Sequence, residues 1–219
     1  GSSHPYGAAG TGSNAVTNEV DWQLQQHLVQ IARDVEVGFI KNTMVEPANN
    51  STARKTAGLA SVITTNVKNN ADTTLDKDDV LDVMQLCYDN GGLMEGETRV
   101  LMVGSTQKRA ISEAFVNATD GYRWQDSNVG GVNCQSIETD FGKLNVMLNR
   151  HVPSDEAYVL SLEDLDVCFL EVPGKGHFFV EPLSKTGAAD KYQIYGEIGL
   201  KYGNQRKHGR LHNIGGYSS

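Results

Sequence analysis

The longest periodic pattern in the chain is helical and covers residues 14–41. Its apolar positions recur every three or four residues: Val16, Val20, Leu24, Leu28, Ile31, Val35 and Phe39. This spacing places them on one stripe of an α-helix, with Asn14 or Thr17 able to cap its start. At about 1.5 Å per residue the helix would extend roughly 40 Å. That length exceeds the need of a compact domain of this size, so we interpret the helix as a strut.

The second half of the chain changes to a β pattern. Short runs separated by turn residues cover Ile137–Thr139, Lys143–Leu148, Ala157–Leu160, Val167–Glu171, Phe178–Leu183, Tyr192–Tyr202 and Gly209–Ile214. In the run Tyr192–Tyr202, Ile194 and Ile198 fall on one face, and Glu197 and Lys201 on the other. Period-two alternation over about ten residues is long for a strand, whose mean length is roughly 5–6 residues.

Between these regions the pattern predicts a helix over Asp76–Tyr88, a strand over Arg99–Val103 and a helix over Thr106–Asn117. Asp76 is a good N-cap for the first of these helices. The polar segment Asn66–Asp76 is predicted as a loop, and Arg54–Ile63 as a short helical turn. The order helix–strand–helix indicates a small α/β piece packed on a strand core. The fold class predicted for the whole chain is α+β.

Charge and composition exclude several classes of function. The chain of 219 residues has a net charge of −8, which argues against bulk or sequence-specific nucleic-acid binding, because phosphate recognition needs clustered Lys and Arg. No apolar run approaches the roughly 20 residues that span a bilayer. The three cysteines, Cys87, Cys134 and Cys168, lie in apolar patterns without metal-like spacing. We therefore expect buried, reduced thiols, which are typical of intracellular proteins.

Candidate chemistry is sparse. Gly104–Lys108 follows a strand and precedes a helix, but it lacks the spacing of a phosphate-binding loop, so Ser105 or Thr106 is better explained as a helix cap. The histidines are dispersed, and no nucleophile, metal-ligand or redox motif occurs. The sequence therefore predicts no enzyme activity, no cofactor and no metal site. It favours a structural role.

Three stretches of the sequence resemble the major capsid proteins of tailed bacteriophages. They are the helix segments Glu19–Leu24 and Arg33–Glu36, the segment Arg54–Leu59, and a C-terminal block that includes Leu148–Pro153, Glu181–Gly187 and Lys207–Leu211. The likeness spans about residues 14–214. It implies the fold shared by tailed-phage and herpesvirus capsids, with a long spine helix and an extended β-sheet in a peripheral domain and an α/β axial domain.

The resemblance implies a domain division. Residues 14–53 and 150–219 would form the peripheral domain, including the spine helix over 14–41, and residues 54–149 would form the axial domain. Residues 1–13 are interpreted as a tag remnant and a flexible lead. Family members carry an N-terminal arm and an extended loop before the spine helix. We therefore expect this chain to be N-terminally truncated.

The implied function is self-assembly, through pentamers and hexamers, into the icosahedral shell around packaged DNA. The implied location is the virion, assembled in the bacterial host cytoplasm, with scaffolding or portal proteins as further partners and no membrane. Expected contacts between subunits are Gln23, Gln26, Gln30 and Arg33 on the helix and Arg54 and Lys55 after it. Plain solvent exposure explains each of them equally well when it is taken singly.

Two alternative functions remain at this point. A head-decoration or tail protein is one, but such proteins are usually β-dominated and lack a strut helix of this length. A small-ligand-binding module is the other, with its ligand at the turn Val103–Lys108. A pocket with converging polar groups at that turn would favour the second alternative, and a flat surface would disfavour it.

Overall fold

The computed structural model describes residues 19–49, 51–116, 124–129, 132–184, 187 and 191–216. The expected tag remnant and lead at residues 1–13, and the caps Asn14 and Thr17, lie outside these residues. The chain divides into two compact units, residues 1–36 with 168–199 and residues 37–167 with 200–219. These limits differ from those of the predicted axial and peripheral domains, and that domain division stays a prediction.

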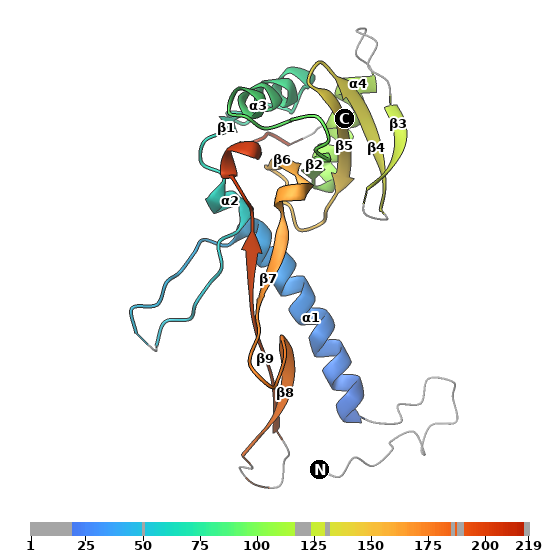
Figure 1. The fold of residues 1–219 in the computed structure, drawn as a ribbon. Helices are drawn as coiled ribbons and strands as arrows, with labels where there is room; N and C mark the ends of the chain where they lie inside the picture. The colour runs from blue at the N-terminus through green and yellow to red at the C-terminus, as the bar shows by residue number, and fades with distance from the viewer. Residues whose placement is uncertain are drawn as a thin grey trace, which may run out of the picture. The chain divides into compact units, whose positions relative to one another are not determined.

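The helices are α1 (Glu19–Lys41), α2 (Leu59–Val62), α3 (Lys77–Asp89) and α4 (Ser105–Val116), with short 3₁₀ turns η2 (Leu162–Asp164) and η3 (Gln205–Lys207) (Figure 1). The strands are β1 (Val67–Asn69), β2 (Arg99–Val103), β3 (Trp124–Val129), β4 (Val132–Thr139), β5 (Gly142–Leu148), β6 (Ala157–Ser161), β7 (Asp166–Leu170), β8 (Phe178–Leu183), β9 (Lys191–Lys201) and β10 (Gly209–His212). The predicted strut helix is therefore confirmed over its described part, and so is the long strand at β9.

The larger unit is built on a seven-stranded mixed sheet with the order β1-β10-β6-β2-β5-β4-β3. The pairs β1–β10 and β2–β5 are parallel, and the other pairs are antiparallel. Strand β2 lies near the middle of the sheet, and four of its five residues are buried. Burial on both faces explains why its sequence is a continuous apolar run and not an alternating one.

Successive residues of the central strands point to opposite faces of the sheet, and each face is covered by its own hydrophobic core. Leu101, Val103 and Val159 face a cluster with buried side chains of α3 and α4. Val100 and Tyr158 face a second cluster, which includes Ile40 at the end of α1 and Leu59 of α2. The predicted α/β piece is therefore a sheet covered by helices on both faces.

Helix α3 begins as its sequence predicts. The Asp76 carboxylate accepts a hydrogen bond from the Asp79 backbone N–H at 2.9 Å, and the Asp79 carboxylate accepts one from the Asp76 N–H at 3.0 Å. This reciprocal capping box satisfies two backbone donors that the first helical turn leaves without partners. The Asp79 carboxylate also accepts a bond from Lys68, and these contacts hold its pKa below the ordinary value despite burial, which acts in the opposite direction.

Two expectations were wrong. The polar segment Asn66–Asp76 is not all loop, because it contains β1, which extends the sheet beside β10. Cys168 on β7 is exposed, whereas Cys87 is buried as expected. Burial raises the pKa of the Cys87 thiol to about 12, so it stays protonated at neutral pH. The side chain of Cys134 lies outside the described residues.

Gly209, the first residue of β10, is needed because α3 packs directly on it. A Cβ at this position would lie 2.4 Å from Val83 Cγ1 and 2.8 Å from Cys87 Sγ, both on α3. We expect Gly209→Ala to lower the free energy of unfolding by about 1–3 kcal/mol, the usual cost of overpacking a core. Urea unfolding followed by circular dichroism measures this. Gly216→Ala is the control, since no atom lies within 4 Å of its Cβ position; equal effects of both changes would contradict the packing account.

His208 is a fully buried histidine that connects the turn after β9 to the end of β6. Its Nδ1 accepts a hydrogen bond from the Ser161 N–H at 3.3 Å, so its Nε2–H donates to the Tyr202 carbonyl at 2.9 Å. Burial lowers the pKa of His208, although the charges of Asp164 and Glu97 act in the opposite direction and that of Lys207 supports the lowering. A second proton would place an N–H at Nδ1, facing the Ser161 N–H.

This arrangement predicts a loss of stability in mild acid. The unfolded chain takes up the histidine proton near the ordinary pKa of about 6.5, before the folded chain does, so the free energy of unfolding falls as pH drops below that value. Urea unfolding between pH 7.5 and 5.5 should show this slope, and His208→Gln should reduce it. The same replacement at exposed His27 should leave the slope unchanged. A slope that is identical in the His208 variant would exclude this histidine as its cause.

The smaller unit contains a three-stranded sheet with the order β7-β9-β8. In the antiparallel pair β8–β9, Phe178 lies opposite Gly196 and Val180 lies opposite Ile194. Because residues directly opposite each other point to the same side of a sheet, these four share one face. Packing explains the glycine at position 196, since a Cβ there would lie 2.6 Å from the Phe178 ring.

Candidate subunit-contact surfaces

The middle of α1 carries no charged side chain although it is mostly exposed. Between Asp21 and Arg33 the sequence is apolar, Gln or His, and only Leu24 and Ile31 are half-buried. Trp22 is 46% exposed and Val29 is 50% exposed. Solvated helix faces normally carry charges, whereas the buried centre of a protein interface is depleted of them and enriched in aromatic residues. This stretch therefore has the composition of a contact surface.

Trp22, Gln26, Val29 and Arg33 form one line along α1, which we call the Trp22 stripe. Their spacing of four, three and four residues places them on a single helix face. Gln23 and Gln30 lie beside this line and are also exposed. The four helix residues predicted as subunit contacts thus lie along the same side of α1 as the exposed Trp22.

Arg54 and Lys55 belong to the larger unit and lie on the loop between α1 and α2. Both are exposed, and Lys55 forms an isolated antiparallel bridge with Val45, in which the two residues exchange backbone hydrogen bonds of 3.2 and 3.0 Å. This bridge gives the loop a fixed base. The structure does not place Arg54 and Lys55 on the same element as the Trp22 stripe.

A second apolar surface lies on the three-stranded sheet. We call it the aromatic face, and its members are Phe169, Phe178, Val180, Tyr192 and Ile194. Phe169 meets Phe178 edge-on, with ring centroids 6.2 Å apart, which places Phe169 on the same side. Phe169 and Tyr192 are 44% and 48% exposed. Because exposed apolar side chains gathered on one face are typical of interaction sites, the aromatic face is a candidate contact surface.

The opposite side of the same sheet is mixed in character. Phe179 stacks at a tilt on Tyr195, with centroids 5.5 Å apart, and the Lys175 ammonium lies 4.9 Å above the Phe179 ring. Lys175 also pairs with Glu181. This side of the sheet therefore combines aromatic rings with a charged pair.

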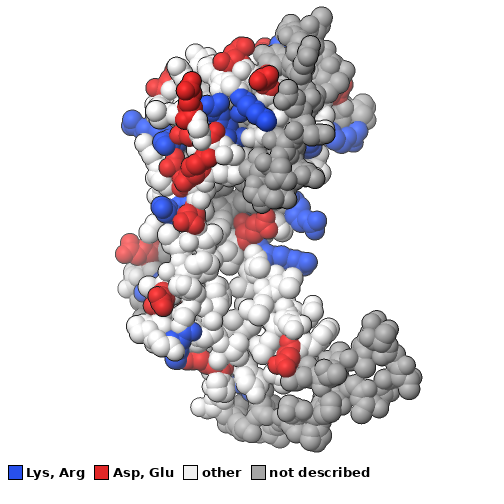
Figure 2. Space-filling model, turned by 45° about the vertical axis from the view of Figure 1, so that its right-hand side comes forward, with Lys and Arg blue, Asp and Glu red and all other residues white. Residues whose placement is uncertain are grey.

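The distribution of charge supports this reading of the surface. Figure 2 shows charged side chains gathered over the unit that holds the seven-stranded sheet, and broad uncharged areas over α1 and the three-stranded sheet. The uncharged areas therefore coincide with the elements that carry the Trp22 stripe and the aromatic face.

The structure gives little support to a small-ligand site at the turn Val103–Lys108. It borders a depression of about 370 Å³ lined by Ser105, Thr106, Leu148, Arg150, Val152 and Ser154 at the start of α4. Its polar groups are hydroxyls and one exposed guanidinium. Among the described residues no cluster of His, Cys, Asp or Glu could hold a metal ion. In the same part of the chain, no helix combines the length and hydropathy of a membrane span.

Comparison with known proteins identifies the family. Residues 5–215 match the sequence model of the family described as SU10 major capsid protein. The chain belongs to this family. The resemblance to major capsid proteins of tailed phages is thereby confirmed, and with it the function of a phage major capsid protein. Among curated proteins, none matches the chain significantly.

The fold of this capsid protein is similar to that of several solved structures. The chain in the holo-SrpI encapsulin complex from Synechococcus elongatus PCC 7942 is similar with a TM-score of 0.68 and 12% identity, over 95% of this chain and 71% of that one. A chain of the cyanophage A-1(L) capsid asymmetric unit is similar with a TM-score of 0.65 and 11% identity, over 95% and 73%. A chain of the satellite phage P4 procapsid, which includes the size determination (Sid) protein, gives 0.52 and 12%, over 90% and 66%. These likenesses confirm the predicted α+β capsid fold.

Trp22, Val29 and Phe169 are the contact candidates of this capsid protein that sequence reasoning missed. The helical pattern predicts one apolar stripe and one polar face, and Trp22 and Val29 fall on the polar face. The signal that could have found them is the uncharged run between Asp21 and Arg33. Phe169 was counted as part of a strand pattern without a separate role.

Proposed function

We propose that copies of this capsid protein assemble, through pentamers and hexamers, into the icosahedral shell around packaged DNA. The observation that carries the proposal is the exposed, uncharged stretch of α1 with Trp22 in it. Exposing a tryptophan and a valine to water on one face has no stabilising role within the single chain, because burial of apolar surface is what lowers the free energy. Burial against a neighbouring copy supplies that role.

A ring of identical subunits requires head-to-tail contacts, in which one patch meets a different patch on the next copy. The Trp22 stripe and the aromatic face provide two such patches. Gln26 and Arg33 contribute polar groups within the first patch, and Gln23 and Gln30 form its polar border. Arg54 and Lys55 contact neighbours through charge. In this arrangement residues 54–149 act as the axial domain, and residues 14–53 and 150–219 act as the peripheral domain.

The protein acts as a structural subunit of the virion and not as an enzyme. Its assembly takes place in the cytoplasm of the bacterial host, where scaffolding or portal proteins are further partners. The acidic balance of −8 suits a container for DNA, since a strongly basic inner surface would bind DNA non-specifically.

Sedimentation velocity combined with negative-stain microscopy of the full chain tests this proposal. We expect rings or closed particles of uniform size that dissociate as the concentration falls. A protein that remains monomeric at every concentration and salt condition would contradict the proposal.

A further inference from the structure

The first strand of the sheet leaves one row of backbone groups open. β1 lies at the edge of the seven-stranded sheet, and among the described strands it pairs only with β10. The Asn66 carbonyl accepts from the Arg210 N–H at 2.8 Å, and the Asn70 N–H donates to the His212 carbonyl at 2.9 Å. Because backbone groups alternate in direction along a strand, Val67 and Asn69 point their N–H and C=O groups away from β10, to the open edge.

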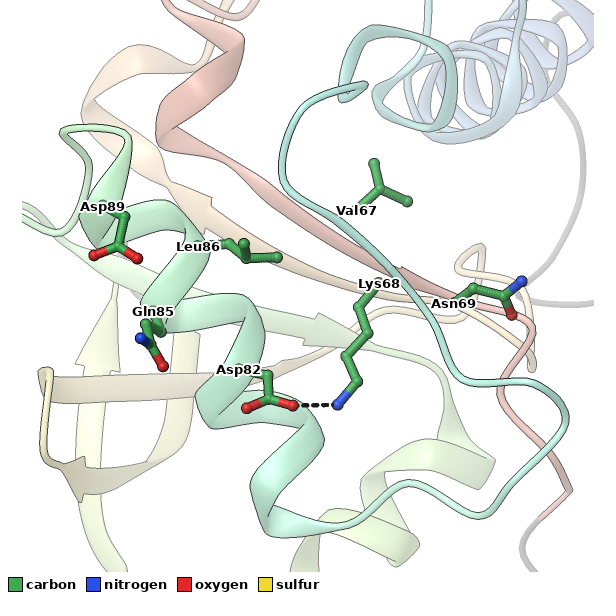
Figure 3. Close-up of a pocket in the computed structure, with 7 residues that line it drawn as sticks. All are labelled: Val67, Lys68, Asn69, Asp82, Gln85, Leu86 and Asp89. Carbon is green, nitrogen blue, oxygen red and sulfur yellow. Dashed lines mark hydrogen bonds and ion pairs between the residues drawn. The ribbon is translucent and has the colours of Figure 1, made fainter.

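A groove runs along this edge between β1 and α3 (Figure 3). It has a volume of about 480 Å³, and its walls are Val67, Lys68 and Asn69 of β1 and Asp82, Gln85, Leu86 and Asp89 of α3. Of the α3 residues in this wall, Asp82, Gln85 and Asp89 are exposed and Leu86 is half-buried. The groove thus combines a free strand edge with a helix wall that is polar except for Leu86.

The groove is acidic. Its one ammonium group, on Lys68, is held by Asp79 at 2.7 Å and Asp82 at 2.6 Å, and these partners raise the pKa of Lys68 although burial acts against them. Asp89, at the end of α3, is exposed, and no hydrogen bond or ion pair of its side chain is present in the described chain. The groove is lined by two carboxylates, those of Asp82 and Asp89, and the charge of Lys68 is already balanced by Asp79 and Asp82, so the groove favours a cationic occupant and repels phosphate groups.

We propose that this groove binds an extended polypeptide segment that carries lysine or arginine at alternate positions. The segment adds as a further strand beside β1, with its backbone bonded to Val67 and Asn69. Side chains on the α3 side place their cationic ends at Asp82 and Asp89 and their aliphatic stems along Leu86. The mixed sheet thereby gains an eighth strand from a partner chain.

The test uses a fluorescein-labelled peptide of alternating valine and lysine, titrated with the full chain and followed by anisotropy. We expect saturable binding, and none of a matched peptide with glutamate in place of lysine. Val67→Pro should weaken binding about tenfold, because it removes an N–H from the open edge while leaving the bonds to β10 intact. Circular dichroism checks that this variant is folded.

Asp89→Lys provides a second variant that does not alter the strand. It replaces an exposed residue at the helix end, where a cation is favourable, so folding should be unaffected. We expect binding of the lysine peptide to weaken about tenfold and binding of the glutamate peptide to appear. Glu95→Lys, at an exposed loop position outside the groove, is the control and should leave both unchanged. Absence of binding to the unaltered chain, or binding insensitive to both variants, would overturn the proposal.

Discussion

Replacing Trp22 with alanine is expected to abolish assembly while leaving the folded chain intact. The side chain is 46% exposed in the single chain, so its removal should change the free energy of unfolding by no more than about 0.5 kcal/mol. Tryptophan at the centre of an interface typically contributes about 2 kcal/mol or more, roughly 30-fold in the dissociation constant of each contact. Because every subunit of a closed shell repeats the contact, we expect particles to disappear from sedimentation profiles.

The matched control for this change is Tyr88→Ala. Tyr88 is another exposed aromatic residue, 60% accessible, and it lies on α3, outside the proposed contact surfaces. We expect particles of the usual size from this variant. Gln26→Glu, which inserts a charge into the Trp22 stripe, should reproduce the defect of the tryptophan variant. Normal particles from both stripe variants would show that this face of α1 makes no subunit contact.

Replacing Phe115 with alanine is expected to have the largest effect on stability. Phe115 lies on α4, has no exposed surface and belongs to the core between the helices and the seven-stranded sheet. Phe→Ala substitutions in cores lower the free energy of unfolding by about 3–5 kcal/mol, because apolar contacts are lost and a cavity remains. Total stabilities are about 5–15 kcal/mol, so urea unfolding should show a large shift of the midpoint.

Phe169→Ala makes the same chemical change at an exposed position, so we expect the opposite balance of effects on stability and assembly. Phe169 is 44% exposed, and among the ring pairs that the structure describes it meets only Phe178, on the aromatic face, and His177. Its removal should cost about 1 kcal/mol of folding stability, yet weaken particle formation. If Phe169→Ala were as destabilising to the fold as Phe115→Ala and assembled normally, the assignment of the aromatic face would be wrong.

The elements that the sequence predicts well are those with strong periodicity. The stripe of α1 and the alternation of β9 each extend over many residues, and the apolar run Arg99–Val103 matches β2 in both of its bounds. β1 was missed because it has three residues, two of them polar, and is defined only by its backbone bonds to β10. No side-chain pattern predicts a strand of this kind.

The exposed apolar residues are harder to predict, because a residue that is exposed in the single chain can be buried in an assembly. Cys168 lies between Val167 and Phe169, and this apolar run suggested a core strand, whereas all five residues of β7 are exposed. An apolar strand that contacts other copies and one that fills its own core have the same composition. For the same reason the sequence pattern does not distinguish Trp22 and Val29 from ordinary helix residues, although their exposure is the strongest indication of a contact surface.

A cryo-electron microscopy reconstruction of the assembled particle tests the account most directly. We predict that the Trp22 side chain is buried against a neighbouring copy, with Gln26 and Arg33 in the same contact. Particles in which Trp22 faces solvent would contradict the proposed role of α1, and the subunit contacts would have to lie on other surfaces of the chain.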